Sequence, residues 1–436
     1  MQQPMDEELH TTEEWEVNQE MLQAMKRKTD NPPKLLTRAA CSIFRLPQSV
    51  KDSNCDSYEP QAVSIGPYHR GDPNLNMIEE HKWAYLGAML RRLGPSVVSL
   101  EDLVKAVRSL EARARECYSE EISMTSDEFI EMMILDGCFI LELFRRSTRS
   151  VESKDPMHSN TWVSYSLRRD LIKLENQIPL FVLRRLFTLT REGKESSTSL
   201  TSLALEFFSM GRNVEVIISK LSGLDCKHLL DLIRASYVKS SSSEAQGSEK
   251  DKDSPLICSL SKLRRSGIEI KRVSAESFLD VSFKGGILHM PEITITGFMS
   301  SFLLNCVAYE QCHSVESDYF TTYVTFLDCL VNSGRDVEYL CDKKIFRNYF
   351  GSDAELAKFI NSMGNEMVVD IPSSYLSEMF AEVDKYYTNN WHVQVASFKY
   401  TYFNTPWSLI SALAAGVLLL LTVAQTFFSI YPVVHK

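Results

Sequence analysis

Residues 132–141 have the sequence Met132-Met-Ile-Leu-Asp-Gly-Cys-Phe-Ile-Leu141, which is apolar on almost every side of a helix. A helix with this pattern is normally buried, so we expect it at the centre of the core. The capping-box pattern Thr125-Ser-Asp-Glu128 precedes it and predicts where the helix begins. We expect the helix to run to about Arg146, with the rest of the fold packed around it.

Apolar residues at helical spacing predict further helices on both sides of this segment. Ile78–Leu93 carries an apolar stripe that includes Trp83 and Leu86, and a second capping box, Ser99-Leu-Glu-Asp102, opens a helix to about Cys117. The other expected helices are Leu167–Gln177, Leu180–Leu186, Leu200–Met210, Lys227–Val238, Phe302–Gln311, Tyr319–Asn332, Asp336–Cys341, Ala354–Ser362 and Tyr375–Tyr387.

A β-hairpin is predicted at residues 277–295. Two runs with strand periodicity flank Gly285-Gly286, a two-residue turn signal, so that Phe283 opposes Leu288. Gly267–Ile270 is expected to add a third strand, and Gln61–Arg70 is predicted as a separate short strand. The expected fold class is mainly α with a small antiparallel β element, followed by one C-terminal transmembrane helix.

The chain is expected to divide into four parts. Residues 1–40 form an acidic mobile leader, with a short helix near its end. Residues 41–398 form one helical domain, interrupted by the polar insertion 239–255, whose composition is typical of a flexible loop. Residues 407–431 form the membrane anchor, and 432–436 are a short tail.

The anchor is the strongest single signal in the sequence. No Asp, Glu, Lys or Arg occurs from Tyr400 to Val434, and Leu409–Phe428 has about the length that a helix needs to cross hydrocarbon. Aromatic residues flank it, as they do at membrane interfaces. The alternative is a buried core helix. The residues assigned to the anchor are Trp407, Leu409, Leu418, Leu419, Leu420, Leu421, Gln425, Phe427, Phe428 and Tyr431.

Two features of the anchor suggest self-association as an option. The Gln425 amide either faces a partner helix or reaches the headgroup layer. Ala412 and Gly416 are four residues apart, so they share one helix face that a second helix can approach closely. The expected partners are thus the lipid bilayer, an unidentified protein and, through this helix, a second copy of the chain.

The expected localisation is a single-pass membrane protein of the plasma membrane or endomembranes, with its bulk in the cytosol. The first 30 residues contain no apolar run, so no signal peptide is expected. None of the 16 Asn residues lies in a glycosylation sequon, and the ten cysteines are scattered without a disulfide framework. The net charge of −10 argues against nucleic-acid binding.

Six blocks of the sequence resemble one plant family, the domain-of-unknown-function 247 family, also called UPF0481. The blocks are Ser64–His69, Met132–Phe144, Leu174–Pro179, Lys227–Leu232, Leu304–Gln311 and Tyr402–Trp407. The resemblance covers about residues 41–431. It implies a plant membrane protein without established enzymatic activity, and in grasses a pollen-side role in self-incompatibility. The motif residues that it marks as structural are Gly66, Pro67, Tyr68, His69, Asp136, Gly137, Cys138, Glu175, Asn176, Gln177 and Pro179.

The sequence lacks the usual signatures of catalysis and of bound groups. It has no phosphate-binding glycine loop, no paired zinc-ligand spacing and no nucleophile elbow, so no cofactor or metal is expected. Cys138 lies in the apolar helix, where a packed thiol is favoured over a nucleophile. For His69 a hydrogen-bonded structural role is favoured over that of a general base.

Buried carboxylates are the remaining enzymatic option. Asp136, Glu142, Asp170 and Glu175 lie in apolar surroundings, and two of them meeting across helices would suit a hydrolase. Buried charges are normally paired, however, so pairing with cations is favoured. The cations considered as partners are Arg45, Lys82, Arg113, Arg115 and Arg168.

The amides of Asn176 and Gln177 are expected to satisfy open backbone groups where two helices meet, so that Gln177→Leu destabilises the fold. Taken together, the sequence favours a membrane-tethered interaction protein that is not an enzyme. The competing hypothesis is a hydrolase-type enzyme that uses Asp136, Asp170 and Glu175.

Overall fold

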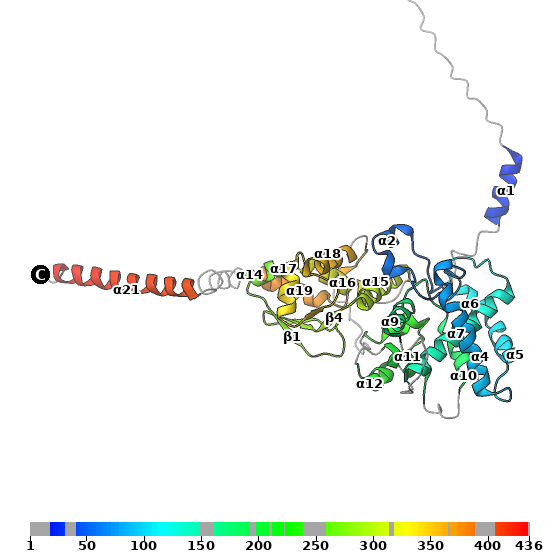
Figure 1. Cartoon of the computed structure of the whole chain (residues 1–436). Coiled ribbons are helices and arrows are strands. Elements are labelled where there is room, and N and C mark those ends of the chain that lie inside the picture. Colours follow the sequence, from blue (N-terminus) through cyan, green and yellow to red (C-terminus); the bar gives the residue numbers. More distant parts are fainter. Residues whose placement is uncertain are drawn as a thin grey trace, which may run out of the picture.

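The structure is a computed structural model of the whole chain (Figure 1). The residues that it describes are 18–30, 41–148, 160–191, 198–208, 212–221, 223–238, 259–313, 318–364, 367–388 and 406–434. The expected insertion at 239–255 and most of the expected leader lie outside these residues. Of the leader, the structure describes the exposed helix α1 (Gln19–Asp30).

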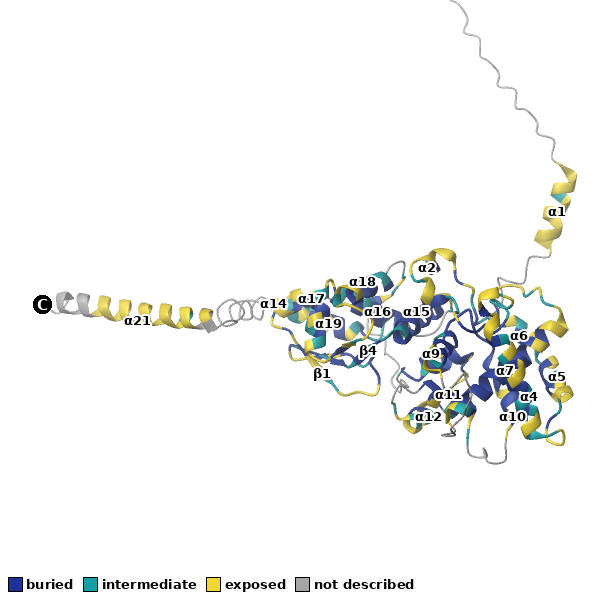
Figure 2. Cartoon of the chain, viewed as in Figure 1, coloured by how far each residue is buried: buried dark blue, intermediate teal, exposed yellow. Residues whose placement is uncertain are grey.

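The long helix α7 (Ser126–Thr148) forms the centre of the N-terminal half, as its sequence predicts. Residues 132–145 are all buried, and Figure 2 shows α7 in the interior of this half. The helices that pack most extensively against it are α4 (Glu79–Leu93), α5 (Leu100–Arg108), α10 (Leu180–Leu189) and α11 (Leu200–Phe208). An ideal Cβ on Gly137 would lie 2.4 Å from Leu186 Cδ1, so glycine permits the close contact between α7 and α10.

Shorter helices complete the N-terminal half. They are α2 (Gln48–Asp52), α3 (Cys55–Tyr58), η2 (Pro73–Ile78), α6 (Glu111–Glu116), α9 (Thr161–Asp170), α12 (Val214–Leu221) and α13 (Leu229–Ala235).

The C-terminal half is built around α15 (Gly297–Cys312), which is also buried on most sides. This helix contacts α3, α9 and α13 of the N-terminal half, so one continuous apolar core runs through the body. The other helices here are α14 (Leu260–Arg265), α16 (Tyr319–Leu330), α17 (Gly334–Asp342), α18 (Asp353–Met363), η4 (Ile371–Ser373) and α19 (Ser377–Tyr387).

Two small sheets lie in the C-terminal half. The predicted hairpin is present, with β2 (Ser282–Lys284) antiparallel to β3 (Ile287–Pro291) and Phe283 opposite Leu288. The third strand, β1 (Glu269–Val273), pairs with β3 in parallel. A second parallel pair joins β4 (Ile293–Ile295) to β5 (Phe346–Asn348), which the sequence pattern does not reveal. The predicted mainly α fold is confirmed, and its β element is mixed in direction.

Several predicted boundaries are wrong. Gln61–Arg70 is not a strand, and the helix predicted at Leu167–Gln177 ends at Asp170. The helix predicted from Ser99 to Cys117 breaks at Ser109 into α5 and α6. The stripe predicted on α4 is displaced, because Trp83 is exposed while Lys82, Tyr85 and Met89 are buried. The first two errors share one cause, the side-chain hydrogen bonds described below.

The helix α21 (Pro406–Val434) is long and apolar enough to cross a membrane. It begins one residue before the expected anchor 407–431 and ends three residues after it. The residues of its apolar stretch Ile410–Phe427 are not buried by the rest of the chain, and Figure 2 shows this helix as exposed. The alternative of a buried core helix is therefore not supported.

Candidate functional site

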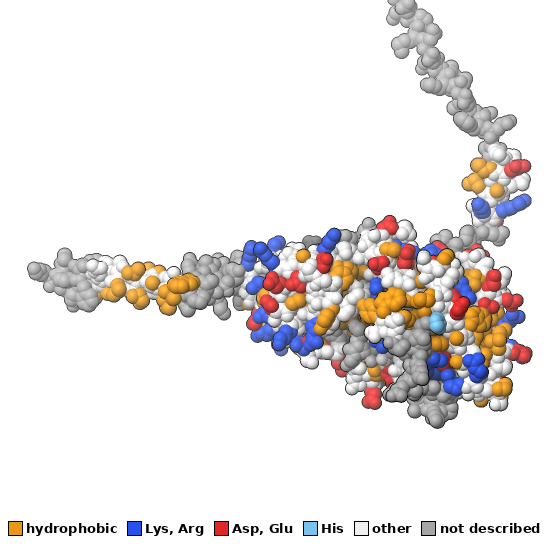
Figure 3. All heavy atoms as spheres, in the orientation of Figure 1, with side chains coloured by type: hydrophobic (Ala, Val, Ile, Leu, Met, Phe, Trp, Pro, Cys, Tyr) orange, Lys and Arg blue, Asp and Glu red, His pale blue; other side chains and the backbone are white. Residues whose placement is uncertain are grey.

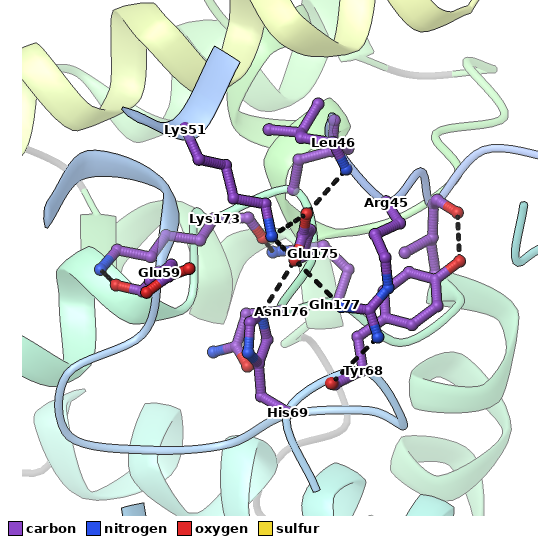
Figure 4. A network of polar contacts seen from close by, with 12 residues as sticks. Arg45, Leu46, Lys51, Glu59, Tyr68, His69, Lys173, Glu175, Asn176 and Gln177 are labelled. Atoms are coloured by element: carbon purple, nitrogen blue, oxygen red, sulfur yellow. Dashed lines mark hydrogen bonds and ion pairs between the residues drawn. The ribbon is translucent and has the colours of Figure 1, made fainter. Parts of the chain in front are cut away.

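Glu175 lies at the centre of a buried polar network in the connection between α9 and α10 (Figure 4). Its carboxylate accepts hydrogen bonds from the Leu46 amide at 2.7 Å and from Lys51 Nζ, which lies 2.8 and 2.9 Å from the two oxygens. His69 Nε2 lies 3.2 Å from Oε2. Burial alone would raise the pKa of Glu175, but the contacts with His69, Lys51 and the Leu46 amide lower it below its ordinary value.

The neighbouring amides of Asn176 and Gln177 bind backbone groups from three segments. Asn176 Oδ1 accepts from the Ile65 amide at 2.7 Å, and its Nδ2 donates to the Val63 carbonyl at 3.1 Å. Gln177 Nε2 donates to the carbonyls of residues 171 and 173, and its Oε1 accepts from the Leu230 amide at 3.2 Å. These contacts confirm that the two amides satisfy open backbone groups near helix ends.

The substitution Gln177→Leu is expected to lower the free energy of unfolding by about 2 kcal/mol, because it leaves buried carbonyls and one amide without partners. A denaturant titration of the full-length chain in mild detergent measures this loss. Gln48→Leu is the matched control, because Gln48 is exposed on α2 and its side chain donates to the exposed Asp52 at 2.9 Å. Equal midpoints for the two variants would contradict the assigned role of Gln177.

Asp170 explains why residues 61–65 do not form a strand. Its carboxylate accepts from three consecutive backbone amides, those of residues 61, 62 and 63, at 2.6 to 3.1 Å. Lys173 Nζ lies 3.1 Å from the same carboxylate. Because side chains take these donors, the segment needs no partner strand. The same interactions hold the chain after Asp170 in a turn and end α9 there.

Asp136 binds the next part of this segment from the central helix α7. Its Oδ2 accepts from the Gly66 amide at 2.9 Å, and Lys82 Nζ lies 2.7 Å from its Oδ1. Lys82 also donates to the Ser64 carbonyl. Both charged side chains are completely buried. Burial raises the pKa of Asp136, and Lys82 opposes that rise.

The three carboxylates proposed for catalysis are thus each occupied by a cation and by backbone amides. The expectation of cation pairing is confirmed for Asp136 with Lys82. Glu175 pairs mainly with Lys51, while Arg45 lies 3.9 Å away. Three of the arginines considered as partners lie over aromatic rings instead: Arg113 over Phe181, Arg115 over Phe129 and Arg168 over Phe207. Glu142 pairs with Arg92 at 2.8 Å.

The remaining motif residues, Tyr68, Pro67, Pro179 and Cys138, have structural roles around this network. The Tyr68 hydroxyl lies 3.1 Å from Ser119 Oγ and donates to the Ile43 carbonyl at 3.3 Å. Pro67 follows Gly66 in the turn, and Pro179 is the N-cap of α10. Burial raises the pKa of Cys138 to about 12, which suits a packed thiol rather than a nucleophile.

An open depression of about 750 Å³ lies elsewhere, between α10, α11 and α12. Its lining includes Arg184, Phe187 and Leu221, and none of the three carboxylates. Within the described ranges no group of three or more His, Cys, Asp or Glu residues is placed to hold a metal ion. The described part of the chain therefore offers a structural polar network at the motif residues rather than an open pocket.

His228 is a member of this network that the sequence interpretation did not single out. Its Nδ1 accepts from the Asp231 amide at 3.2 Å, which caps α13, and its Nε2 lies 3.0 Å from the Ser42 carbonyl. Burial lowers the pKa of His228 from 6.5 to about 4. The neutral ring with the proton on Nε2 satisfies both contacts, because Nδ1 must accept.

Acid is expected to destabilise the fold through His228. The unfolded state binds a proton near pH 6.5 and the folded state only near pH 4, so stability is lost as the pH falls from 6.5 to 4. The loss amounts to about 3 kcal/mol at 1.36 kcal/mol per pKa unit. In His228→Asn the new side chain can still accept a hydrogen bond at the N-cap of α13, but it does not titrate between pH 4 and 6.5. Denaturant titrations of this variant should therefore show no loss of stability from residue 228 in that pH range. Parallel pH profiles for the two proteins would contradict the assignment.

Several other buried polar residues were not singled out from the sequence, although some of them lie within its motif blocks. Asn305 accepts from the Leu174 amide at 2.8 Å and donates to the Ser57 carbonyl at 2.9 Å. Glu310 pairs with Arg234 at 3.0 Å. The signal that can find such residues is a charged or amide side chain inside an apolar run, as in Leu304–Gln311. Lys173, between Ile172 and Leu174, carries the same signal, whereas Lys51, between Val50 and Asp52, does not.

Comparisons with known proteins find relatives that match most of the chain. The family model DUF247, described as plant protein of unknown function, matches residues 43–421. A UPF0481 protein of Arabidopsis thaliana is 38% identical over 417 residues, which cover 90% of this chain and 87% of the relative. A putative UPF0481 protein of the same plant is 25% identical over 490 residues, with 91% of both chains covered. No solved structure matches the chain significantly.

Proposed function

Because the chain belongs to the DUF247 family of plant proteins of unknown function, we propose that it is a membrane-tethered protein that acts by binding another protein, without catalysis. The observation that carries this proposal is the exposed apolar helix α21. Its described residues Trp407, Leu418 and Phe427 are each more than half exposed. In water such a surface would be strongly unfavourable, so a bilayer is its natural environment.

The polar network supports the non-catalytic part of the proposal. A general acid or base must reach a substrate proton, whereas Asp136, Asp170 and Glu175 are nearly inaccessible and are bonded to cations and amides. These residues instead hold the body in one conformation. A rigid body with a charged surface on a membrane tether is suited to recognition. The pollen-side role in self-incompatibility that the resemblance implies for grass members would be one form of it.

We place the body on the cytosolic side of the plasma membrane or an endomembrane. The absence of glycosylation sequons is consistent with this side. Cys117, Cys138, Cys226 and Cys306 are buried free thiols, as is usual in a reducing compartment. Protease added outside sealed cells should leave the body intact, and its removal would overturn this topology.

The anchor is tested by alkaline carbonate extraction of microsomes that contain the full-length chain. We expect the protein to stay in the pellet, and a version that ends at Lys399 to appear in the supernatant. Release of the full-length chain by carbonate would contradict the anchor. Proximity labelling from both versions, compared in the same cells, then identifies the protein partners that depend on the tether.

Self-association through α21 is a separate part of the proposal. Apart from the neighbouring backbone of α21 itself, no heavy atom of the described residues lies within 4 Å of an ideal Cβ on Gly416, so a second helix has room to approach it. Gly416→Leu should reduce crosslinking between copies in membranes, while Leu420→Ile, on the same helix, should not. An unchanged crosslinking pattern in Gly416→Leu and in Gln425→Leu would exclude both proposed contacts.

A further inference from the structure

Lysine and arginine side chains gather at one end of the body, around α14 and β1 (Figure 3). We call this surface the basic end and define it by seven exposed residues from α14, β1, β2 and the turn after α17. They are Lys262, Arg264, Arg265, Lys271, Lys284, Lys343 and Lys344. Glu269 and Asp342 are the acidic residues beside them in the chain, and the Glu269 carboxylate lies 3.1 Å from Lys271 Nζ, so it offsets one of the seven charges. This excess of positive charge contrasts with the net charge of −10 for the whole protein.

Side-chain contacts and strand register bring these cations onto one surface. The Arg264 guanidinium lies 4.0 Å from the centroid of the Tyr339 ring, and Lys343 Nζ lies 5.5 Å from the same centroid, so α14 and the end of α17 are adjacent. In the sheet, Ile270, Phe283 and Leu288 are buried. Side chains alternate along a strand, so Lys271 and Lys284 lie on the outer face.

The route of the chain to the membrane helix begins at this end. α19, the last helix of the body, contacts β2, and the Tyr386 ring lies 5.7 Å from Phe283 and packs over Gly286. Residues 389–405 connect α19 to Pro406, where α21 begins. Seventeen residues reach at most about 60 Å even when fully extended. The tether thus keeps the basic end close to the membrane surface.

We propose that the basic end docks onto anionic lipid headgroups of the same bilayer that holds α21. This inference rests on the proposed membrane anchor. The cytoplasmic leaflet is negatively charged, and each cation near it strengthens binding by about fivefold. The tether raises the effective concentration of the surface at the bilayer, so modest individual contacts suffice. The cations are spread over several elements rather than gathered in a pocket, which suits a lipid surface better than an acidic peptide.

The docking is tested by lysine footprinting of the full-length protein in vesicles. The protein is reconstituted into phosphatidylcholine vesicles and into phosphatidylcholine–phosphatidylserine vesicles, and a membrane-impermeant acylating reagent is added. We expect acylation of Lys271 and Lys284 to be slower by about fivefold or more in the anionic vesicles, and the difference to vanish at high salt. Lys105, exposed on α5, serves as the internal control and should react equally in both.

Charge variants separate docking from folding. The triple variant Lys262→Gln, Lys271→Gln and Lys284→Gln should make Lys344 react equally fast in both kinds of vesicle. The matched triple Arg91→Gln, Arg108→Gln and Arg185→Gln, at exposed cations away from the basic end, should keep Lys344 protected in the anionic vesicles. Vesicle flotation after a carbonate wash reports the anchor independently. A chain that floats but reacts equally in both vesicles overturns the docking alone, and a chain that does not float overturns the anchor.

Discussion

Replacing Lys82 by Met is expected to lower the free energy of unfolding by about 4 kcal/mol, because it removes the nearer of the two cations that face the buried Asp136 carboxylate and leaves only Arg70, at 3.9 Å, among the described residues. Lys82 Nζ lies 2.7 Å from Asp136 Oδ1 and also contacts Glu79, and its side chain is fully buried. A denaturant titration of the full-length chain in mild detergent measures the loss. Lys105→Met is the control, since its pair with Glu101 is exposed and contributes at most about 0.5 kcal/mol.

The stability loss in Lys82→Met is also expected to depend on pH. Without Lys82, the folded-state pKa of Asp136 rises further above its unfolded value of 3.8. The loss in the free energy of unfolding is therefore largest at neutral pH, where Asp136 must be charged, and it becomes smaller as the pH falls toward 3.8. In Lys82→Met with Asp136→Asn, the new side-chain oxygen can still accept from the Gly66 amide without carrying a charge. This double variant should recover at least half of the loss. An effect of Lys82→Met no larger than that of Lys105→Met would show that the pair is dispensable.

Gly66→Ala is expected to cost about 4 kcal/mol, from two sources. The φ angle of Gly66 is +78°, which costs a residue with a side chain about 1–2 kcal/mol. In addition, an ideal Cβ at this position would lie 2.5 Å from the Gln177 carbonyl oxygen, a backbone atom that the network holds in place. The substitution must therefore displace either the turn or the connection that carries Asn176 and Gln177.

Gly71→Ala is the control that measures the cost of the positive φ angle alone, so that the cost of the contact with Gln177 can be obtained by difference. Gly71 has nearly the same φ angle, +84°, and no atom within 4 Å of an ideal Cβ, so its cost should be limited to about 1–2 kcal/mol. The difference between the two variants, measured by denaturant titration under identical conditions, is the cost of the contact with Gln177. Equal losses would indicate that the approach of residue 66 to residue 177 is not constrained.

The helices of the body were largely predictable because their apolar faces repeat at helical spacing. α7 and α5 illustrate this, since the capping boxes at Thr125–Glu128 and Ser99–Asp102 mark the two helix starts and local periodicity marks the buried faces. The hairpin register was predictable as well, because Gly285-Gly286 leaves only one pairing that puts Phe283 and Leu288 on the same face.

The buried polar network was only partly predictable. Within residues 61–65 the run Val63-Ser-Ile65 alternates as in a strand, but the backbone amides of Val63 and Ile65 bind to Asp170 and Asn176, which lie more than 100 residues away in the chain. Periodicity reports burial and not hydrogen-bond partners, so it cannot separate a strand from a segment held by side chains. For the same reason the sequence suggested cations for the carboxylates but did not identify Lys51 or Lys173.

The hydrogen bonds from side chains to residues 61–66 also bear on biosynthesis. The Val63 amide and its acceptor Asp170 are 107 residues apart in the chain. The Ser57 carbonyl accepts a hydrogen bond from Asn305, which is synthesised 248 residues later. At about 5–20 residues per second, the ribosome needs roughly 5 to 20 seconds to deliver Asp170 after residue 63 has been made. During that interval the backbone amides of residues 61–63 lack the acceptor that they have in the folded protein, so we expect the nascent chain to depend on chaperones until Asp170 has emerged.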